Sequence, residues 1–349
     1  MKESKTMREA SNVTIKDIAK KLGVSFSTVA KALNNDPVVA EKTRIRVREK
    51  ANEMGYFPNL MAIGLRSKST RSIGMILNDL ENPTRSYILK KISMDMVGQG
   101  FTPFIFDSAY DQEIERQNIY NLLSRMPDGI LISPVSSQFT NIDLLEKVYD
   151  RTIILSIENK KMPSNYVHMD HIKGGNIAAS AMLSMGHIQN LIIMEPQDYP
   201  SAVQFRTGVL QAYKELRKPL AEDHFIYTYP NMEGGEKAFL NFYESARKKK
   251  DQPITGIIAS NDLIAVGVYK AAKNIGLKIP DDISIIGYDD LPIASLVTPR
   301  LSTLIYPKEK IADHCTDILL SKILNNDPNI FKFSLEPDIV MRESIKDIS

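Results

Sequence analysis

Residues 14–35 read TIKDIAKKLGVSFSTVAKALNN, and this stretch decides the fold of the N-terminal part of the chain. Thr14 is a suitable helix N-cap, and the apolar residues that follow it recur at helical spacing. Gly23 predicts the end of this helix, because glycine readily adopts the left-handed conformation of a C-cap. Ser25 is a suitable N-cap for a second helix, which we expect to run to Leu33.

A third helix is expected from about Glu41 to Met54, after the turn-forming residues Asn-Asn-Asp-Pro at 34–37. The side of this helix that faces the other two is expected to carry Ile45, Val47, Ala51 and Met54. Two short helices joined by a glycine-containing turn and followed by a bracing helix are typical of a helix-turn-helix domain. We assign that small all-α domain to residues 13–57 and regard residues 1–12 as an N-terminal extension.

From Arg71 onward, the pattern changes to short β-rich runs that alternate with helical segments. Among these runs are SIGMIL at 72–77, NLIIM at 190–194 and ISIIGY at 283–288. Such alternation indicates βαβ units, in which helices cover both faces of parallel sheets. Because residues 71–349 are too many for one ordinary doubly wound sheet, we expect two similar subdomains.

Positive charge is concentrated at the N-terminal end of the chain. Residues 1–70 carry 14 Lys and Arg against 7 Asp and Glu, whereas the rest of the chain carries 30 against 35. An excess of this kind suggests that the N-terminal part binds a polyanion. A solvated basic surface without a partner is the alternative.

Composition also indicates the cellular compartment of the protein. No apolar run approaches the roughly 18 residues of a membrane span, and the first dozen residues lack the apolar core of a signal peptide. The single cysteine, Cys315, excludes an intramolecular disulfide and a multi-thiolate metal site. We therefore expect a cytoplasmic protein without a membrane partner.

Several ordered motifs together resemble the lactose and purine repressor (LacI) family over nearly the whole chain after the first dozen residues. The helix-turn-helix stretch is the most specific motif, and GYFPNLMAIGLRSKSTRSIGMIL at 55–77 continues it. PDGILISP at 127–134, ASNDLIAVGVYKAAKNIGLKIPDDISIIGYDD at 259–290 and TPRLSTL at 298–304 follow in the order typical of that family. The ordered set is more specific than any one of these motifs.

The resemblance implies a helix-turn-helix headpiece, a hinge over residues 58–70 and a periplasmic-binding-protein-like α/β core of two doubly wound subdomains. The first subdomain is expected to comprise residues of about 71–171 and 298–325, and the second those of about 172–297 and 326–345. The core is expected to bind a small-molecule effector and to form a homodimer. Since a two-fold dimer matches a two-fold site, the expected partner is a palindromic double-stranded DNA operator, and the expected function is transcription regulation, with repression as its mode.

The second helix is expected to lie in the major groove, where the family uses three positions for base readout. Lys31 can donate to guanine O6 and N7, Ser27 to several base edges, and Phe26 can pack on a thymine methyl. A core aromatic is the alternative role for Phe26, and a solvated helix lysine is the alternative for Lys31. Contacts to phosphates or to the minor groove are expected from the rest of the DNA-binding set, Thr14, Ser25, Thr28, Asn34, Thr43 and Leu65.

Two departures from the family affect this DNA-binding surface. The third helix begins after Ala40, where the family usually has a Ser or Thr N-cap, and the loss of such a cap costs about 1 kcal/mol. In the hinge, Leu65 matches the family residue that inserts between base pairs and kinks the duplex. Gly64 precedes it and costs about 1 kcal/mol relative to alanine in a helix, so we expect the hinge helix to order only on DNA.

The effector is expected in the cleft between the subdomains, at the ends of their strands. Arg206, Asn261 and Asp289 are the positions that the resemblance supports best. Acidic and amide side chains of this kind suit the paired hydroxyls of a sugar ring, although a turn or a helix cap is the alternative role for each. The full set of expected effector-binding residues is Thr84, Arg85, Asp107, Ser133, Glu158, Arg206, Asn261, Asp289 and Tyr306.

A further departure concerns the charge of the effector. Many relatives have an aromatic pair after Asn-Pro at the end of the first strand, whereas this chain has Thr84 and Arg85. If Arg85 and Arg206 both face the cleft, an anion such as a sugar phosphate is expected between them, because two guanidinium groups repel each other. If Arg85 instead turns outward or pairs with Glu81 or Glu158, the pocket suits a neutral sugar.

Other classes of function have weaker support. His168, Asp170 and His171 can suggest a metal site, but no further ligand lies nearby, and polar residues at a strand end are the preferred interpretation. No phosphate-binding glycine loop, zincin motif or nucleophile elbow is present, so neither a cofactor nor enzyme activity is expected. A solute-binding protein for transport shares the core fold but needs an export signal and no headpiece. Induction or co-repression by the effector, and the docking of a protein co-regulator on the core, both stay open.

Overall fold

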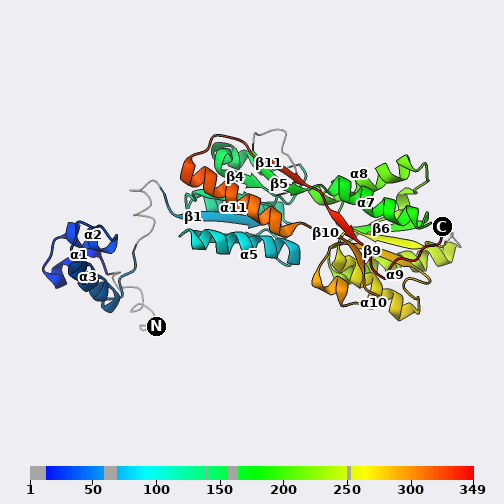
Figure 1. Ribbon diagram of the computed structural model, residues 1–349, viewed down its shortest axis with the longest axis horizontal. Coiled ribbons are helices and arrows are strands. Elements are labelled where there is room, and N and C mark those ends of the chain that lie inside the picture. Colours follow the sequence, from blue (N-terminus) through cyan, green and yellow to red (C-terminus); the bar gives the residue numbers. More distant parts are fainter. Residues whose placement is uncertain (1–12, 59–68, 139, 156–163, 250–252) are drawn as a thin grey trace, which may run out of the picture. The chain divides into compact units, whose positions relative to one another are not determined.

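The chain forms two compact units, Met1–Thr70 and Arg71–Ser349. Figure 1 shows short helices in the first unit and two sheets with helices packed on them in the second. Among the residues that the structure describes, no helix is long and apolar enough to span a lipid bilayer. The computed structural model describes residues 13–58, 69–138, 140–155, 164–249 and 253–349.

The described part of the first unit contains the helices α1 (Ile15–Leu22), α2 (Phe26–Leu33) and α3 (Glu41–Glu53). Thr14 caps α1 in a capping box: Asp17 N–H donates to Thr14 Oγ1 at 3.3 Å, and Thr14 N–H donates to Asp17 Oδ2 at 2.9 Å. Gly23 follows α1 in the left-handed conformation, with φ of 67°. Ser25 caps α2 by accepting from Thr28 N–H at 3.0 Å. The expected helix ends are therefore confirmed.

The headpiece core is formed by apolar residues from all three helices. Ile18, Val29 and Val47 are each at most 1% exposed. The expectation that Ile45 shares this core is wrong, because Ile45 is 46% exposed. Residues two apart on an α-helix point about 200° apart, so Ile45 and Val47 cannot face the same side.

The start of α3 lacks a side-chain cap, as the sequence predicts. Ala40 occupies the N-cap position and makes no capping hydrogen bond. A serine hydroxyl there can accept from a free N–H of the first turn, so we expect Ala40→Ser to stabilise α3 by about 0.5–1 kcal/mol. Native-state hydrogen exchange at the amides of α3 measures this change, and unchanged exchange rates would contradict it.

The first sheet of the core unit has the strand order β11-β5-β4-β3-β1-β2, and all its pairs are parallel. Helices α5 (Pro83–Gly98) and α11 (Lys308–Asn325) pack on one face, while α6 (Gln112–Leu123) and the 3-10 segment η1 (Ile142–Arg151) pack on the other. In β1, Met75 belongs to the core on the α5 side and Ile76 to the core on the α6 side, which explains the unbroken apolar run of this strand. The strands are β1 (Ser72–Leu77), β2 (Thr102–Asp107), β3 (Gly129–Ile132), β4 (Thr152–Ile154), β5 (Asn165–Met169) and β11 (Lys332–Leu335).

The second sheet has the order β12-β10-β9-β8-β6-β7, and only β12 is antiparallel to its neighbour. Helices α7 (His171–Ser184) and α8 (Pro200–Glu215) cover one face, and α9 (Met232–Lys249) and α10 (Asp262–Ile275) cover the other. The expected class, a helical headpiece with two doubly wound α/β subdomains, is thereby confirmed. The strands are β6 (Asn190–Met194), β7 (Phe225–Tyr227), β8 (Gly256–Ala259), β9 (Ser284–Asp289), β10 (Ser302–Ile305) and β12 (Asp338–Val340), and short 3-10 segments are η2 (Glu222–His224) and η3 (Pro292–Ser295).

The chain passes between the two sheets after β5, after β10 and after β11. The expected division of the C-terminal part holds for α11, which packs on the first sheet, and for β12, which pairs in the second, but it is wrong for β10 and β11. Residues 298–325 were assigned to the first subdomain, but β10 pairs with β9 of the second sheet. Residues 326–345 were assigned to the second subdomain, but β11 pairs with β5 of the first. A short apolar run predicts a strand without predicting its partner, so this assignment required the tertiary structure.

Candidate functional site

The N-terminal part of α2 presents aromatic and polar side chains to solvent. Phe26 is 45% exposed, so it does not belong to the headpiece core. Ser27 and Lys31 are exposed beside it, whereas Val29 and Ala32 on the other side of α2 are fully buried. The buried side of α2 packs against α1 and α3, and the exposed side is free to approach base edges.

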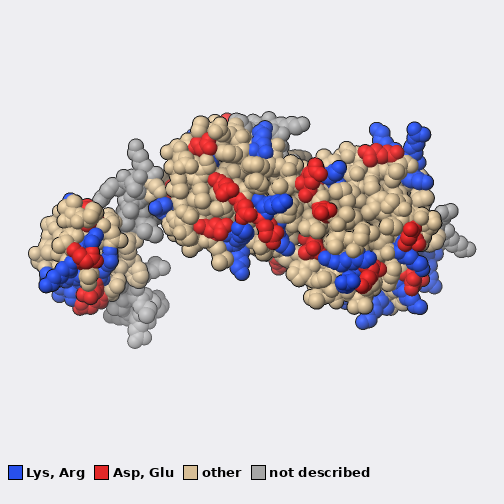
Figure 2. Space-filling view, in the orientation of Figure 1, with Lys and Arg blue, Asp and Glu red and all other residues tan. Residues whose placement is uncertain are grey.

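Several polar residues near α2 lie at the ends of helices. Ser25 Oγ lies 2.9 Å from Ser27 Oγ and 2.8 Å from Thr28 Oγ1. Asn34 is the C-cap of α2, and Thr43 is half-buried in the first turn of α3. Figure 2 shows Lys and Arg side chains over the lower part of the visible headpiece, with Asp and Glu side chains among them. Hydrogen-bond donors and positive charge on one small unit suit contacts to a phosphate backbone.

The core unit contains two adjoining cavities, a larger and a smaller one, whose walls share Arg85, His171, Ser201 and Tyr306. The first sheet contributes residues that follow β1, β3, β4 and β5. The second sheet contributes the last residue of β9 and residues that follow β6, β8 and β10. The cavities therefore lie at the carboxyl ends of strands from both sheets, where open α/β sheets bind ligands.

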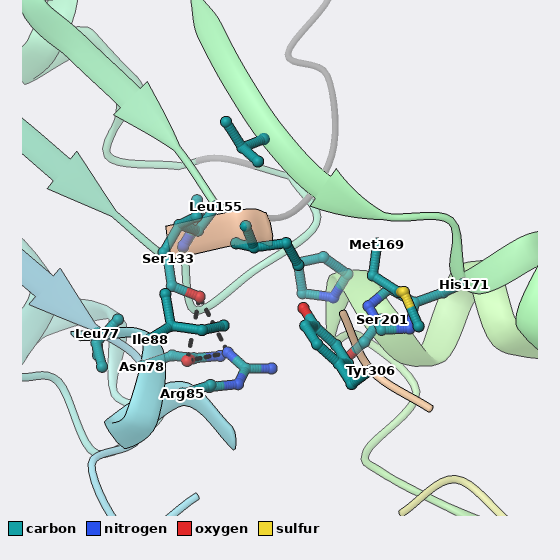
Figure 3. Close-up of a pocket in the computed structure, with 14 residues that line it drawn as sticks. Leu77, Asn78, Arg85, Ile88, Ser133, Leu155, Met169, His171, Ser201 and Tyr306 are labelled. Atoms are coloured by element: carbon teal, nitrogen blue, oxygen red, sulfur yellow. Dashed lines mark hydrogen bonds between the residues drawn. The ribbon is translucent and has the colours of Figure 1, made fainter. Parts of the chain in front are cut away.

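Arg85 extends into these cavities from the first turn of α5 (Figure 3). Its Nη1 donates to Asn78 Oδ1 and, at 2.9 Å, to Ser133 Oγ. Figure 3 shows Tyr306 across the cavity from the guanidinium group. Arg85 thus points inward and does not pair with Glu81, while Glu158, the other expected partner, lies outside the described residues.

Two acidic side chains of the second sheet, Glu195 and Asp289, line the smaller cavity. Burial raises the pKa of Glu195, and burial with the nearby Asp262 raises the pKa of Asp289 well above its usual range. Ser201 Oγ donates to Glu195 Oε2 at 2.6 Å. Asp289 has a φ of 111°, which side-chain-bearing residues rarely adopt. The structure around it therefore holds this carboxyl group in a defined place.

The remaining polar groups of the cavities are neutral. Burial lowers the pKa of His171 to about 3, with a further contribution from the charge of Arg85, so its imidazole is uncharged at pH 7. Its Nδ1 lies 3.2 Å from the hydroxyl oxygen of Tyr288. Imidazole, hydroxyl and carboxyl groups together offer both donors and acceptors, as a ligand rich in hydroxyl groups requires.

Most of the expected effector residues meet in these cavities. Asn261 also caps α10, since its Oδ1 accepts from Ile264 N–H at 2.7 Å, so the capping role and the cavity position occur together. Asp107 is absent from the cavity walls; it lies exposed at the end of the edge strand β2 and accepts from Ala109 N–H at 2.9 Å. Glu158 and the hinge residue Leu65 lie outside the described residues. The expected residues in the cavity walls are Thr84, Arg85, Ser133, Asn261, Asp289 and Tyr306.

Arg206 does not line either cavity, in contrast to the expectation from sequence. Its Nη2 donates to both carboxylate oxygens of Glu222, at 2.6 and 2.7 Å, and its guanidinium carbon lies 4.8 Å from the ring centroid of Phe225. Phe205 lines the smaller cavity instead. Successive residues of a helix are turned by about 100°, so the two side chains point in different directions, and here Phe205 reaches the cavity wall. The argument for an anion held between Arg85 and Arg206 therefore fails.

Several wall residues were not identified from the sequence, among them Asn78, Glu195, Ser201 and Phe205. Asn78 directly follows β1 and Glu195 directly follows β6, so the position of polar residues after buried strands could have identified both. Ser201 and Phe205 reach the cavity from the first two turns of α8. No local pattern marks them, because the direction that a helix face takes depends on its packing.

The three residues that suggested a metal have separate structural roles. His168 Nδ1 lies 2.9 Å from the carbonyl oxygen of Met169, and Asp170 caps α7 by accepting from Lys173 N–H at 2.8 Å. Within the described residues, no group of three or more His, Cys, Asp or Glu side chains is arranged to hold a metal ion.

Comparisons with known proteins agree with this architecture. Residues 14–59 match the model of bacterial regulatory proteins of the lacI family, and residues 179–345 match a periplasmic binding protein-like domain. The HTH-type transcriptional regulator DegA of Bacillus subtilis is 32% identical over 298 residues, which cover 84% of this chain and 86% of that protein. The ribose operon repressor of Escherichia coli is 25% identical over 334 residues, which cover 95% of this chain and 99% of that protein.

Solved structures share the fold. A LacI-family regulator from Silicibacter pomeroyi superposes with a TM-score of 0.84 and 22% identity, over 96% of this chain and 99% of that chain. The lac repressor dimer bound to operator and an anti-inducer has a TM-score of 0.81 and 23% identity over the same shares. These relatives are transcription regulators and not enzymes. The helix-turn-helix unit, the two-sheet core and the identity to DegA across most of both chains show that this chain belongs to the lacI family of bacterial regulatory proteins, which bind DNA and regulate transcription.

Proposed function

We propose that the protein is a cytoplasmic repressor that binds a palindromic operator as a homodimer and responds to a small carbohydrate bound in the cavities of the core. The exposed face of α2 is the observation that carries the DNA-binding part of the proposal. The carbohydrate part rests on the mixed donors and acceptors at the strand ends. Relatives include ribose operon repressors, and solved structures of the same fold were obtained with cellobiose and with ribose.

In this proposal, α2 enters the major groove with Phe26, Ser27 and Lys31 at base edges. The exposure of all three side chains supports this role. Leu65 in the hinge would insert into the minor groove. Phosphates would be contacted by the residues at the helix ends of the headpiece, Thr14, Ser25, Thr28, Asn34 and Thr43.

The dimer is proposed because one headpiece offers a single short reading helix. Each specific base pair adds only about 1–3 kcal/mol of discrimination, so two symmetric half-sites are needed for useful selectivity. Selection of bound sequences from random duplex DNA by the intact protein tests the symmetry directly. Recovery of an inverted repeat is expected, whereas a single asymmetric site would contradict the dimer.

Lys31→Ala is expected to weaken binding to the selected sequence by about 1–3 kcal/mol and to leave binding to random duplex DNA nearly unchanged. The reason is that a base contact depends on the sequence of the DNA, whereas a phosphate contact does not. Titration of both duplexes at one fixed salt concentration measures the two affinities. Lys237→Ala, at an exposed lysine of α9 in the core unit, is the matched control and should change neither. Equal losses on both duplexes would assign Lys31 to a phosphate instead.

A further inference from the structure

We propose that the effector is a hydroxylated carboxylic acid, such as a sugar acid, whose carboxylate is bound by Arg85 and whose hydroxyls face Glu195 and Asp289. This inference rests on the proposed function and specifies the ligand of the same cavities. It does not depend on Arg206, which binds Glu222 outside them.

The first observation is that the hydrogen-bond partners of the Arg85 guanidinium among the described residues are all neutral. Nη1 donates to the amide oxygen of Asn78 and to the hydroxyl of Ser133. Among the described residues, no carboxylate oxygen lies within 4.0 Å of this guanidinium group, and its Nε and Nη2 donate no hydrogen bond. Glu195 and Asp79 interact electrostatically with the Arg85 guanidinium group, but from farther away than an ion pair. A half-buried cation without a close counter-ion is costly, and an incoming anion removes that cost.

The second observation is an unsatisfied hydroxyl next to this cation. Thr84 is 2% exposed and lines the smaller cavity, and its Oγ1 has no hydrogen-bond partner in the part of the chain that the structure describes. Buried polar atoms are nearly always paired, and an unpaired one costs free energy until a partner arrives. Thr84 and Arg85 both line the smaller cavity, so a carboxylate bound there has both a hydroxyl and a guanidinium group in the wall beside it.

The number of cationic groups in the described walls distinguishes a carboxylate from a phosphate. Glu195 and Asp289 lie on the second-sheet side of the smaller cavity. Arg85 is the only cationic side chain in the described walls of either cavity, because His171 is neutral. One guanidinium balances a singly charged carboxylate, whereas a phosphate dianion would keep one negative charge without a cationic partner in these walls. Acidic groups suit the hydroxyls of the same ligand, since each can accept a hydrogen bond.

Matched pairs of ligands test this inference by isothermal titration calorimetry on the intact protein. The acidic probes are D-glucuronate, D-galacturonate, D-gluconate and D-ribonate. Each is compared with the corresponding neutral sugar, D-glucose, D-galactose or D-ribose. D-glucose 6-phosphate and D-ribose 5-phosphate serve as dianionic ligands. We expect at least one acid to bind about 10- to 100-fold more tightly than its neutral counterpart. We expect Arg85→Met to abolish that preference.

Two further variants separate a binding role from a folding defect. Thr84→Val keeps the shape of the side chain and removes the hydroxyl, and it should weaken the acid several-fold with little effect on the neutral sugar. Arg300→Met changes an exposed arginine that pairs with Glu343 outside the cavities, and it should leave ligand binding unchanged. If Arg85→Met does not fold, Arg85→Lys serves in its place, because it retains the charge and loses the planar donors.

The outcomes also separate this inference from the proposed function. Tighter binding of a neutral sugar or of a phosphate, or no binding of any acid in the panel, overturns the inference. Binding of a neutral sugar that Thr84→Val does not affect leaves the carbohydrate-responsive repressor intact. Loss of sequence-specific DNA binding by the wild-type protein would instead overturn the proposed function.

Discussion

Gly208→Ala should destabilise the core unit by about 3 kcal/mol, near the upper end of the usual cost of overpacking. A Cβ at Gly208 in α8 would lie 1.9 Å from the carbonyl oxygen of Ile172 in α7, and a Cβ at Gly175 in α7 would lie 2.1 Å from the carbonyl oxygen of Phe205 in α8. The two helices thus approach each other through a glycine on each. Neither obstructing atom belongs to a flexible side chain, so the whole of α8 has to move, together with Phe205 and Ser201 of the cavity wall.

Urea unfolding of the intact chain measures this loss, with Gly98→Ala as the control. Gly98 is the last residue of α5, and a Cβ there would meet nothing within 4 Å. Alanine should therefore be tolerated, with a gain of up to about 1 kcal/mol from the lower entropy of the unfolded chain. Similar stabilities of the two variants would show that the α7–α8 contact can relax.

Asp262→Ala should lower the free energy of unfolding of the core by about 3–5 kcal/mol, because it leaves two buried donors without an acceptor. Asp262 is fully buried; its Oδ1 accepts from Thr303 Oγ1 at 2.6 Å and its Oδ2 from Leu291 N–H at 2.7 Å. These bonds join α10 to β10 and to the segment after Asp289. The control is Asp281→Ala, which removes an exposed carboxylate paired with Lys346 and should cost less than about 1 kcal/mol.

The same residue makes stability depend on pH. Burial raises the pKa of Asp262 from 3.8 to about 7. Between these values the folded protein holds a proton that the unfolded chain has released, so stability falls as pH rises from about 4 to about 7 and then levels off. Glu195 and Asp289 add a change of the same sign, and both remain in Asp262→Asn. Denaturant unfolding at pH 5 and pH 7 should therefore show a smaller loss for Asp262→Asn than for the wild type; equal losses would mean that Asp262 is ionised in the folded protein at both pH values.

Local patterns were sufficient for the headpiece and for the class of the core. Thr14, Gly23 and Ser25 mark helix ends because capping depends on groups within four residues of each other. Such short-range preferences can be recognised from the sequence alone. The alternation of β-rich and helical runs predicted two doubly wound subdomains for a similar reason. Asn261 and Asp289 were identified through the family resemblance, and the structure places both at the ends of strands.

Long-range relations were decided only by the tertiary structure. The strands with which β10 and β11 pair depend on which sheet edges are still unpaired when these segments reach them. No residue near β10 or β11 determines that choice. Phe205 rather than Arg206 faces the cavity because the packing of α7 against α8 sets the rotation of α8, and one residue step changes the direction by about 100°. Arg85 was recognisable in the sequence as an unusual cation, but that no carboxylate of the described residues lies close to it could be seen only in the folded cavity. That arrangement, an inward-pointing cation with no close counter-ion among the described residues, is the reason why we expect an acidic effector.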